Sequence, residues 1–96
     1  MAYDREFDGI VIGGGHQALV CSAYLAKAGL DVLVVEQGLS VGGGLHTVDV
    51  TGRGFRFNLH SINHFNITGT PWYDDLELAA HGVEYIQPEH EFAMPV

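Results

Sequence analysis

The sequence predicts an α/β fold in which a strand–helix–strand unit is followed by a β-hairpin and a short helix. Two short runs rich in β-branched residues flank a stretch of strong helix formers, and glycine clusters mark the turns between them. Strand, helix and strand within about 30 residues form a βαβ unit, whose crossover between parallel strands is right-handed. We expect residues 1–96 to be one portion of a single domain.

The βαβ unit is expected over the first third of the chain. Its strands are Phe7–Ile12 and Asp31–Glu36, which are continuous apolar runs of the kind that is buried on both faces of a parallel sheet. The helix between them is expected over His16–Ala28, which contains no proline or glycine. Gly29 supplies the left-handed residue that ends this helix.

A different pattern follows the βαβ unit. Two alternating segments, His46–Val50 and Phe55–Leu59, are separated by a turn sequence and predict a β-hairpin. Thr70–Pro71 supplies an N-cap and a first helical residue, and Gly82 is expected to end the short helix that starts there. Two weaker strand candidates lie beyond it, at Val83–Ile86 and Glu91–Val96.

Composition and charge exclude several classes of partner. Four lysines and arginines stand against 12 aspartates and glutamates, and the net charge of −8 gives no electrostatic basis for binding nucleic acid or an anionic membrane. Cys21 is the only cysteine, which excludes an internal disulfide and a cysteine-based zinc site. No apolar run has the length of a membrane span, and the first residues lack the order of a secretory signal. We therefore expect a soluble, cytoplasmic protein.

The first glycine cluster fits the pattern G-x-G-x-x-G/A between a predicted strand and a predicted helix. Gly13 permits the turn, Gly15 lets a pyrophosphate approach the backbone, and Ala18 keeps the helix close to the strand. The first-turn amides of His16 and Gln17 would bind the pyrophosphate with help from the helix dipole. The competing interpretation is an ordinary strand-to-helix turn whose glycines serve only packing.

Glu36 stands at the end of the next predicted strand, about 20 residues beyond the glycines. A carboxylate there accepts hydrogen bonds from both hydroxyls of an adenosine ribose, and its charge repels the 2′-phosphate of NADP. NAD and FAD share the ADP half, so this motif alone leaves both open. A second cluster, Gly42–Gly44, brings further backbone amides over the pyrophosphate and favours the longer FAD molecule.

With these residues the chain resembles the N-terminus of FAD-dependent oxidoreductases of the amine oxidase and phytoene desaturase superfamily. Within it, the chain is most similar to phytoene dehydrogenase-related proteins that carry a pyridine nucleotide-disulfide oxidoreductase domain label. The resemblance runs from about residue 7 to about residue 96. It is carried by the segments DGIVIGGGHQALVCSAYLAKAGLDVLVVE, VGGG and GFRFNLHS. It implies the N-terminal portion of a Rossmann-like FAD-binding domain.

The resemblance also implies a set of FAD-binding residues. They are Gly13, Gly15, His16 and Gln17 at the pyrophosphate, Glu36 and Gln37 at the adenosine ribose, Gly43, Gly44 and Leu45 on the second loop, and His60, Ser61 and Ile62 along the flavin or substrate cavity. The chain departs from the family pattern at three places. Ala18 replaces a glycine, Ser40 replaces an arginine, and Asn58-Leu59-His60 replaces the family's D-x-G segment.

His60 and His64 have the i, i+4 spacing that places two side chains on one face of a helix. Two histidines without a third ligand make a poor metal site, so we expect no metal. Covalent attachment of the flavin through His60 is a second alternative. We favour a lining role for His60, with His64 as a polar loop residue, and we assign no catalytic residue.

The expected function is that of a piece, or small subunit, of a flavin-dependent dehydrogenase, desaturase or oxidase that oxidises a small organic substrate by hydride transfer to flavin. A dinucleotide-binding sheet has five or six parallel strands, and this chain supplies two. Members of the superfamily are several times longer. We therefore expect a second polypeptide that completes the FAD and substrate domains, and no activity from this chain alone. The alternatives are an NAD-binding oxidoreductase fragment and a non-catalytic dinucleotide-binding module.

Overall fold

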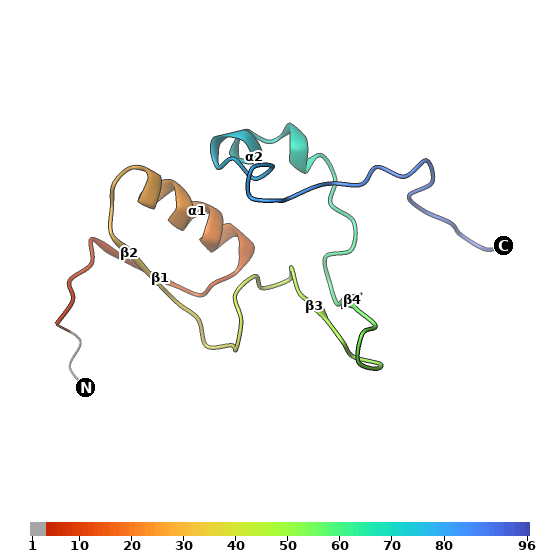
Figure 1. Ribbon diagram of the computed structural model, residues 1–96, viewed down its shortest axis with the longest axis horizontal. Helices are drawn as coiled ribbons and strands as arrows, with labels where there is room; N and C mark the ends of the chain where they lie inside the picture. The colour runs from red at the N-terminus through yellow and green to blue at the C-terminus, as the bar shows by residue number, and fades with distance from the viewer. Residues whose placement is uncertain (1–3) are drawn as a thin grey trace. The chain divides into compact units, whose positions relative to one another are not determined.

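A computed structural model describes residues 4–96 of the chain, which divide into two compact units. Figure 1 traces the chain through both units. The first unit ends at Phe65, and the second comprises residues 66–96. The first contains β1 (Gly9–Ile12), α1 (His16–Lys27), β2 (Val32–Val35), β3 (Thr47–Val48) and β4 (Phe57–Asn58). The second contains the 3₁₀ helix η1 (Ile67–Gly69) and α2 (Pro71–Asp75).

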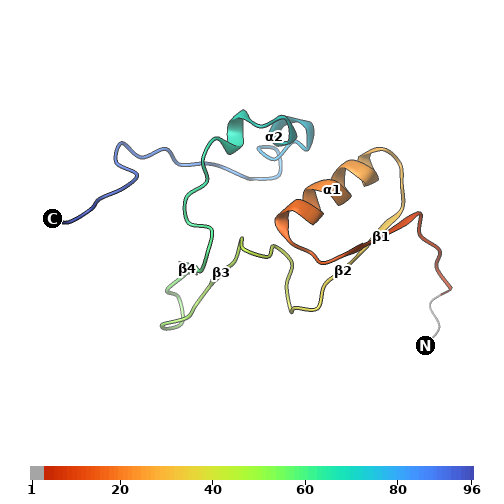
Figure 2. The same ribbon diagram turned by 180° about the vertical axis from the view of Figure 1, so that it is seen from behind.

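The predicted βαβ unit is confirmed. β1 and β2 pair in parallel from Gly9 opposite Val32 to Ile12 opposite Val35. α1 packs against these two strands and lies on the same side of them in both views (Figure 1 and Figure 2). Gly29 has a φ of 92° and donates its N–H to Ala26 O, as expected for a glycine that ends a helix.

Both strands are shorter than predicted because side chains bind the backbone where the pairing begins. Asp8 Oδ2 accepts the Asp31 N–H at 2.8 Å, and the Asp8 N–H donates to Asp31 O at the same distance. The Arg5 guanidinium bonds both carboxylate oxygens of Asp31, at 3.1 and 3.0 Å. The Asp8 side chain thus takes the Asp31 N–H that a ladder bond would otherwise use, and regular pairing begins at Gly9 and Val32.

The two faces of the sheet differ in exposure. Ile10 and Ile12 alternate with Val11 along β1, and they are 63% and 88% exposed. Their register partners Leu33 and Val35 lie on the same face. The prediction that both faces are buried is wrong for the described residues, because α1 covers only the other face. Among residues 4–96 no hydrophobic side chain is fully buried.

The predicted hairpin is present, with two-residue strands. Thr47 pairs with Asn58 and Val48 with Phe57 in an antiparallel ladder. The ladder ends early because Asp49 Oδ2 accepts the Gly54 N–H at 2.9 Å and folds the connecting segment into a loop of its own. None of the helices in residues 4–96 combines the length and the hydrophobicity that a membrane span requires.

The second unit begins as predicted but contains less regular structure. α2 has Thr70 as its N-cap and a proline in its first turn, yet it ends at Asp75 rather than near Gly82. Glu77 has a φ of 53°, which is incompatible with a continuing helix. The strand candidates Val83–Ile86 and Glu91–Val96 are wrong, because no described strand pairs with them. Val83 O instead accepts the hydroxyl of Tyr73 at 3.0 Å.

Candidate functional site

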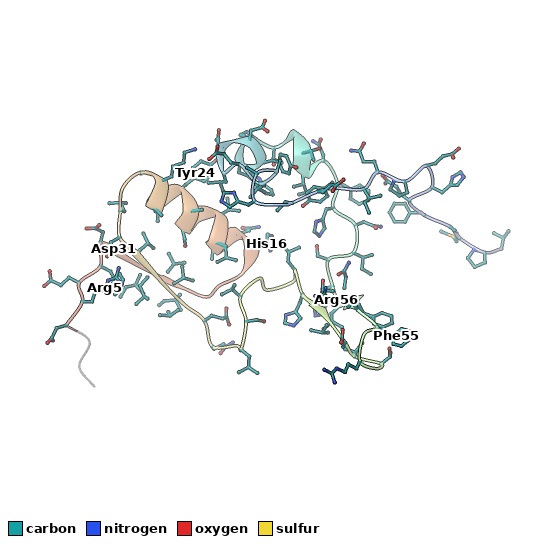
Figure 3. All side chains as sticks on the ribbon, in the orientation of Figure 1. Arg5, His16, Tyr24, Asp31, Phe55 and Arg56 are labelled. Carbon is teal, nitrogen blue, oxygen red and sulfur yellow. The ribbon has the colours of Figure 1, made fainter. Side chains whose placement is uncertain are left out.

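The N-terminus of α1 presents backbone donors without a side-chain cap. Gly15 is its N-cap, with φ −68° and ψ 166°, no side chain caps the helix, and no acidic residue lies in its first turn. The first N–H groups of an α-helix have no acceptor within the helix, and the helix dipole places partial positive charge there. His16 marks this end of the helix in Figure 3. The arrangement is suited to an anion.

The glycines of the first loop have separate reasons to be glycine. Gly13 has a φ of 94°, a conformation that disfavours any side chain. A Cβ on Gly14 would approach Val41 Cγ1 to 2.8 Å, so a side chain there would force Val41 to move. A Cβ on Gly15 would meet no atom within 4 Å. Packing therefore does not account for Gly15, and the backbone at this position is open to close approach.

The second glycine cluster lies directly against the first. The Gly42 N–H donates to Gly14 O at 2.7 Å, and Gly42 and Gly15 form an isolated parallel bridge. A Cβ on Gly43 would lie 3.1 Å from Gly15 Cα and 3.9 Å from the His16 amide nitrogen. The Leu45 N–H closes the turn onto Gly42 O at 3.0 Å. The structure thus brings both loops together at the start of α1.

Glu36 lies beside the same loops, with an exposed side chain that bonds two backbone amides. Oε1 accepts the Gly38 N–H at 2.8 Å, and Oε2 accepts the Gly14 N–H at 2.7 Å. The bond from Gly38, and next the bond from Gly14, hold the pKa of the Glu36 carboxyl below its usual value. Sequence reasoning missed both bonds and missed Gly14 as a member of the site. Gln37, the next residue, is exposed.

The segment predicted to line the flavin is joined to the second loop by one backbone bond. The Ser61 N–H donates to Gly44 O at 3.2 Å, while His60 and Ile62 are both exposed on either side of it. Ser61 Oγ lies 3.0 Å from His64 Nε2, a contact that the sequence did not reveal. His60 and His64 lie outside any helix, so their spacing does not place them on one helical face.

Two amide-lined glycine loops at a helix N-terminus, with a carboxylate at the end of the second parallel strand, define a Rossmann-like dinucleotide-binding unit. The chain belongs to the NAD(P)-binding Rossmann-like domain family, which it matches over residues 11–77. The α/β Rossmann-like fold predicted from the sequence is therefore confirmed.

Three curated relatives are similar to this chain over most of its length or over more than half of it. A limonene dehydrogenase subunit of Castellaniella defragrans is 45% identical over 89 residues, which are 93% of this chain and 16% of the relative. Pyridine nucleotide-disulfide oxidoreductase domain-containing protein 2 of Rattus norvegicus is 37% identical over 82% of this chain and 13% of its own length. All-trans-retinol 13,14-reductase of Macaca fascicularis is 44% identical over 60% of this chain and 10% of its own length.

These relatives carry oxidoreductase names, and the resemblance to oxidoreductases inferred from the motifs is confirmed. The chain is similar to a dinucleotide-binding piece of such proteins and spans 16% or less of their length. No solved structure matches the chain.

Proposed function

We propose that this chain is the FAD-binding N-terminal piece, or a small subunit, of a flavin-dependent oxidoreductase, and that residues 1–96 are one portion of a single FAD-binding domain. The observation that carries the proposal is the bonded pair of glycine loops. Gly42 N–H to Gly14 O, and the bridge between Gly42 and Gly15, put a second set of backbone groups beside the α1 N-terminus. A long dinucleotide that extends past its pyrophosphate can use both loops.

The site residues take their proposed roles from this geometry. The amides of His16 and Gln17 bind the pyrophosphate, with Gly13 and Gly15 allowing its approach. Other proposed contacts are Glu36 and Gln37 at the adenosine ribose, Gly43, Gly44 and Leu45 on the second loop, and His60, Ser61 and Ile62 toward the flavin. The bond between Ser61 and Gly44 supports the last group, because it joins that segment to the second glycine loop.

The choice between dinucleotides is part of the proposal. The Glu36 carboxylate opposes the 2′-phosphate of NADP, so NAD and FAD are the dinucleotides that remain. The second loop favours FAD, because it adds backbone groups that a longer dinucleotide can use. An NAD-binding oxidoreductase piece is the competing function.

In the proposed reaction, FAD and the residues of this chain have different roles. FAD, when bound, supplies the hydride acceptor for oxidation of a small organic substrate. The chain's own groups bind and orient: α1 amides at the pyrophosphate, and the Glu36 carboxylate at the ribose hydroxyls. We assign no proton donor or acceptor among these residues.

The bare face of the sheet supports a proposed partner. Ile10 and Ile12 expose an apolar face that a parallel sheet normally covers with helices. The matched segment is 16% or less of each relative's length, and one relative is named as a subunit. We propose that a second polypeptide supplies the remaining strands, the covering helices and the substrate site.

An absorbance spectrum and an intact mass of the purified protein test the proposal together. A flavin band, with FAD released on denaturation and a second polypeptide at native mass, is the expected result. Titration of stripped protein with FAD and with NAD then compares the two cofactors. Tight NAD binding without FAD binding favours the competing function, and a 10.4 kDa monomer that binds FAD tightly contradicts the partner.

A further inference from the structure

Gly14 links three parts of the candidate site through its backbone. Its N–H donates to Glu36 Oε2, and its carbonyl accepts the Gly42 N–H, both at 2.7 Å. Gly14 is buried, and Val41 packs where its side chain would be. The carboxylate and the second glycine loop are therefore connected through a single fixed residue of the first loop.

The Glu36 carboxylate spans two segments while keeping acceptor capacity. One oxygen binds the Gly14 N–H and the other binds the Gly38 N–H. The two oxygens together carry four lone pairs, so these backbone bonds leave the carboxylate able to accept a ribose hydroxyl. The side chain is exposed, so a ligand can reach it. The same group can organise the backbone and contact a nucleotide.

We propose that Glu36 is a positioning residue that holds the two glycine loops in their pyrophosphate-binding arrangement, separately from any contact with ribose. This inference deepens the proposed dinucleotide-binding function and rests on it. The connection runs from the carboxylate to Gly14, and from Gly14 O to the Gly42 N–H. Glutamine at position 36 has only one acceptor oxygen. Its NH₂ group would therefore face one of the two backbone N–H donors, and that bond would be lost.

Inorganic pyrophosphate is the probe that isolates positioning, because it has no ribose. If Glu36 were only an exposed charge, Glu36→Gln would remove a repulsion and pyrophosphate would bind more tightly. Loss of positioning predicts the opposite sign, with affinity about fivefold weaker, which is the worth of one net hydrogen bond. Calorimetry on the complete protein, with any polypeptide that co-purifies, measures this. Unchanged or tighter binding overturns the proposal.

Asp49→Asn is the matched control. Asp49 is also an accessible carboxylate that accepts a glycine N–H, from Gly54 at 2.9 Å, but it lies in the hairpin loop. The substitution removes the same charge and weakens a similar bond. It is expected to leave pyrophosphate affinity unchanged or slightly raised. An equal loss of affinity in both variants overturns the assignment of the effect to Glu36.

Amide hydrogen exchange in the absence of ligand gives a second readout. The Gly42 N–H bonds Gly14 O and not Glu36, so its exchange reports the linkage between the loops. Glu36→Gln, and the shorter Glu36→Asp, are expected to speed exchange at Gly14 and Gly42 about fivefold. Exchange in the β1–β2 ladder stays at the wild-type rate. Unchanged exchange at Gly42 overturns the proposal.

The two measurements separate the inference from the function on which it rests. A wild-type protein that binds neither pyrophosphate nor any dinucleotide contradicts the proposed function. In that case the exchange of Gly42 still decides whether Glu36 positions the loops.

Discussion

Replacement of Gly15 by alanine is expected to separate nucleotide binding from folding. Gly15 has a φ of −68°, which alanine adopts readily, and a Cβ there meets no protein atom within 4 Å. The added methyl group therefore projects into open space at the α1 N-terminus, where we propose that the pyrophosphate lies.

The size of each effect follows from this geometry. Alanine reduces the freedom of the unfolded chain, which stabilises the fold by about 0.4–1 kcal/mol. It is a poorer N-cap than glycine, which costs a similar amount, so the free energy of unfolding changes by less than about 1 kcal/mol. A charge-assisted hydrogen bond is worth about 1.5–3 kcal/mol. Losing one from the pyrophosphate weakens FAD or ADP binding at least about tenfold.

The assay pairs calorimetric titration of FAD and ADP with thermal unfolding of the same samples. Gly9→Ala is the control, because a Cβ on this β1 glycine also meets nothing within 4 Å, and we expect wild-type binding from it. If Gly15→Ala binds both nucleotides with wild-type affinity, the pyrophosphate does not lie over Gly15 and the reasoning is refuted.

Packing, protonation and the exposed sheet face can each be tested by a separate measurement. Gly14→Ala is expected to lower the free energy of unfolding by about 1–3 kcal/mol in a denaturation experiment, because its methyl group meets Val41 Cγ1 at 2.8 Å. A free energy of unfolding equal to that of the wild type would contradict that contact. The bonds that the Glu36 carboxylate accepts are expected to be complete above the usual carboxyl pKa and to be lost as pH falls through the lowered pKa, because backbone amides bond the charged form. The NMR shift of the Gly14 amide should therefore titrate in that acidic range. A shift that stays constant there would contradict the bond. Ile12→Asp is expected to change the free energy of unfolding of this chain by no more than about 0.5 kcal/mol, because Ile12 is 88% exposed. The same substitution is expected to abolish co-purification of the second polypeptide in native mass measurements. Retained association would show that this sheet face is not the interface.

The parts of the fold that were predictable from sequence are those fixed by local chemistry. α1 begins at His16 and Gly29 ends its last turn as expected, because glycines on both sides leave few alternatives. The adjacency of the two glycine loops was also expected, and the bond between Gly42 and Gly14 realises it. The proposed contacts of these loops with FAD remain predictions.

The features that escaped sequence reasoning depend on contacts between distant segments. Glu36 bonds the Gly14 amide, across 22 positions, because the β1 and β2 ends lie side by side in the register that Asp31 begins. The pattern at Val83–Ile86 has the residues of a strand, but a strand forms only where a neighbouring strand accepts its amides. The residue types of a segment determine its strand propensity, whereas strand pairing also depends on a neighbouring strand.

The net charge of −8 excludes polyanions without excluding a single pyrophosphate, because the two cases differ in which groups make contact. A nucleic acid is held by many lysine and arginine contacts over a large surface, and this chain has four such residues in all. In the proposed site a pyrophosphate meets the amides of the α1 N-terminus, whose partial charges are fixed by the backbone. Surface charges more than about 8 Å away are largely screened at physiological salt. The Glu36 carboxylate bonds the Gly14 amide of the first loop, and we propose that it meets the ribose of the dinucleotide rather than a phosphate.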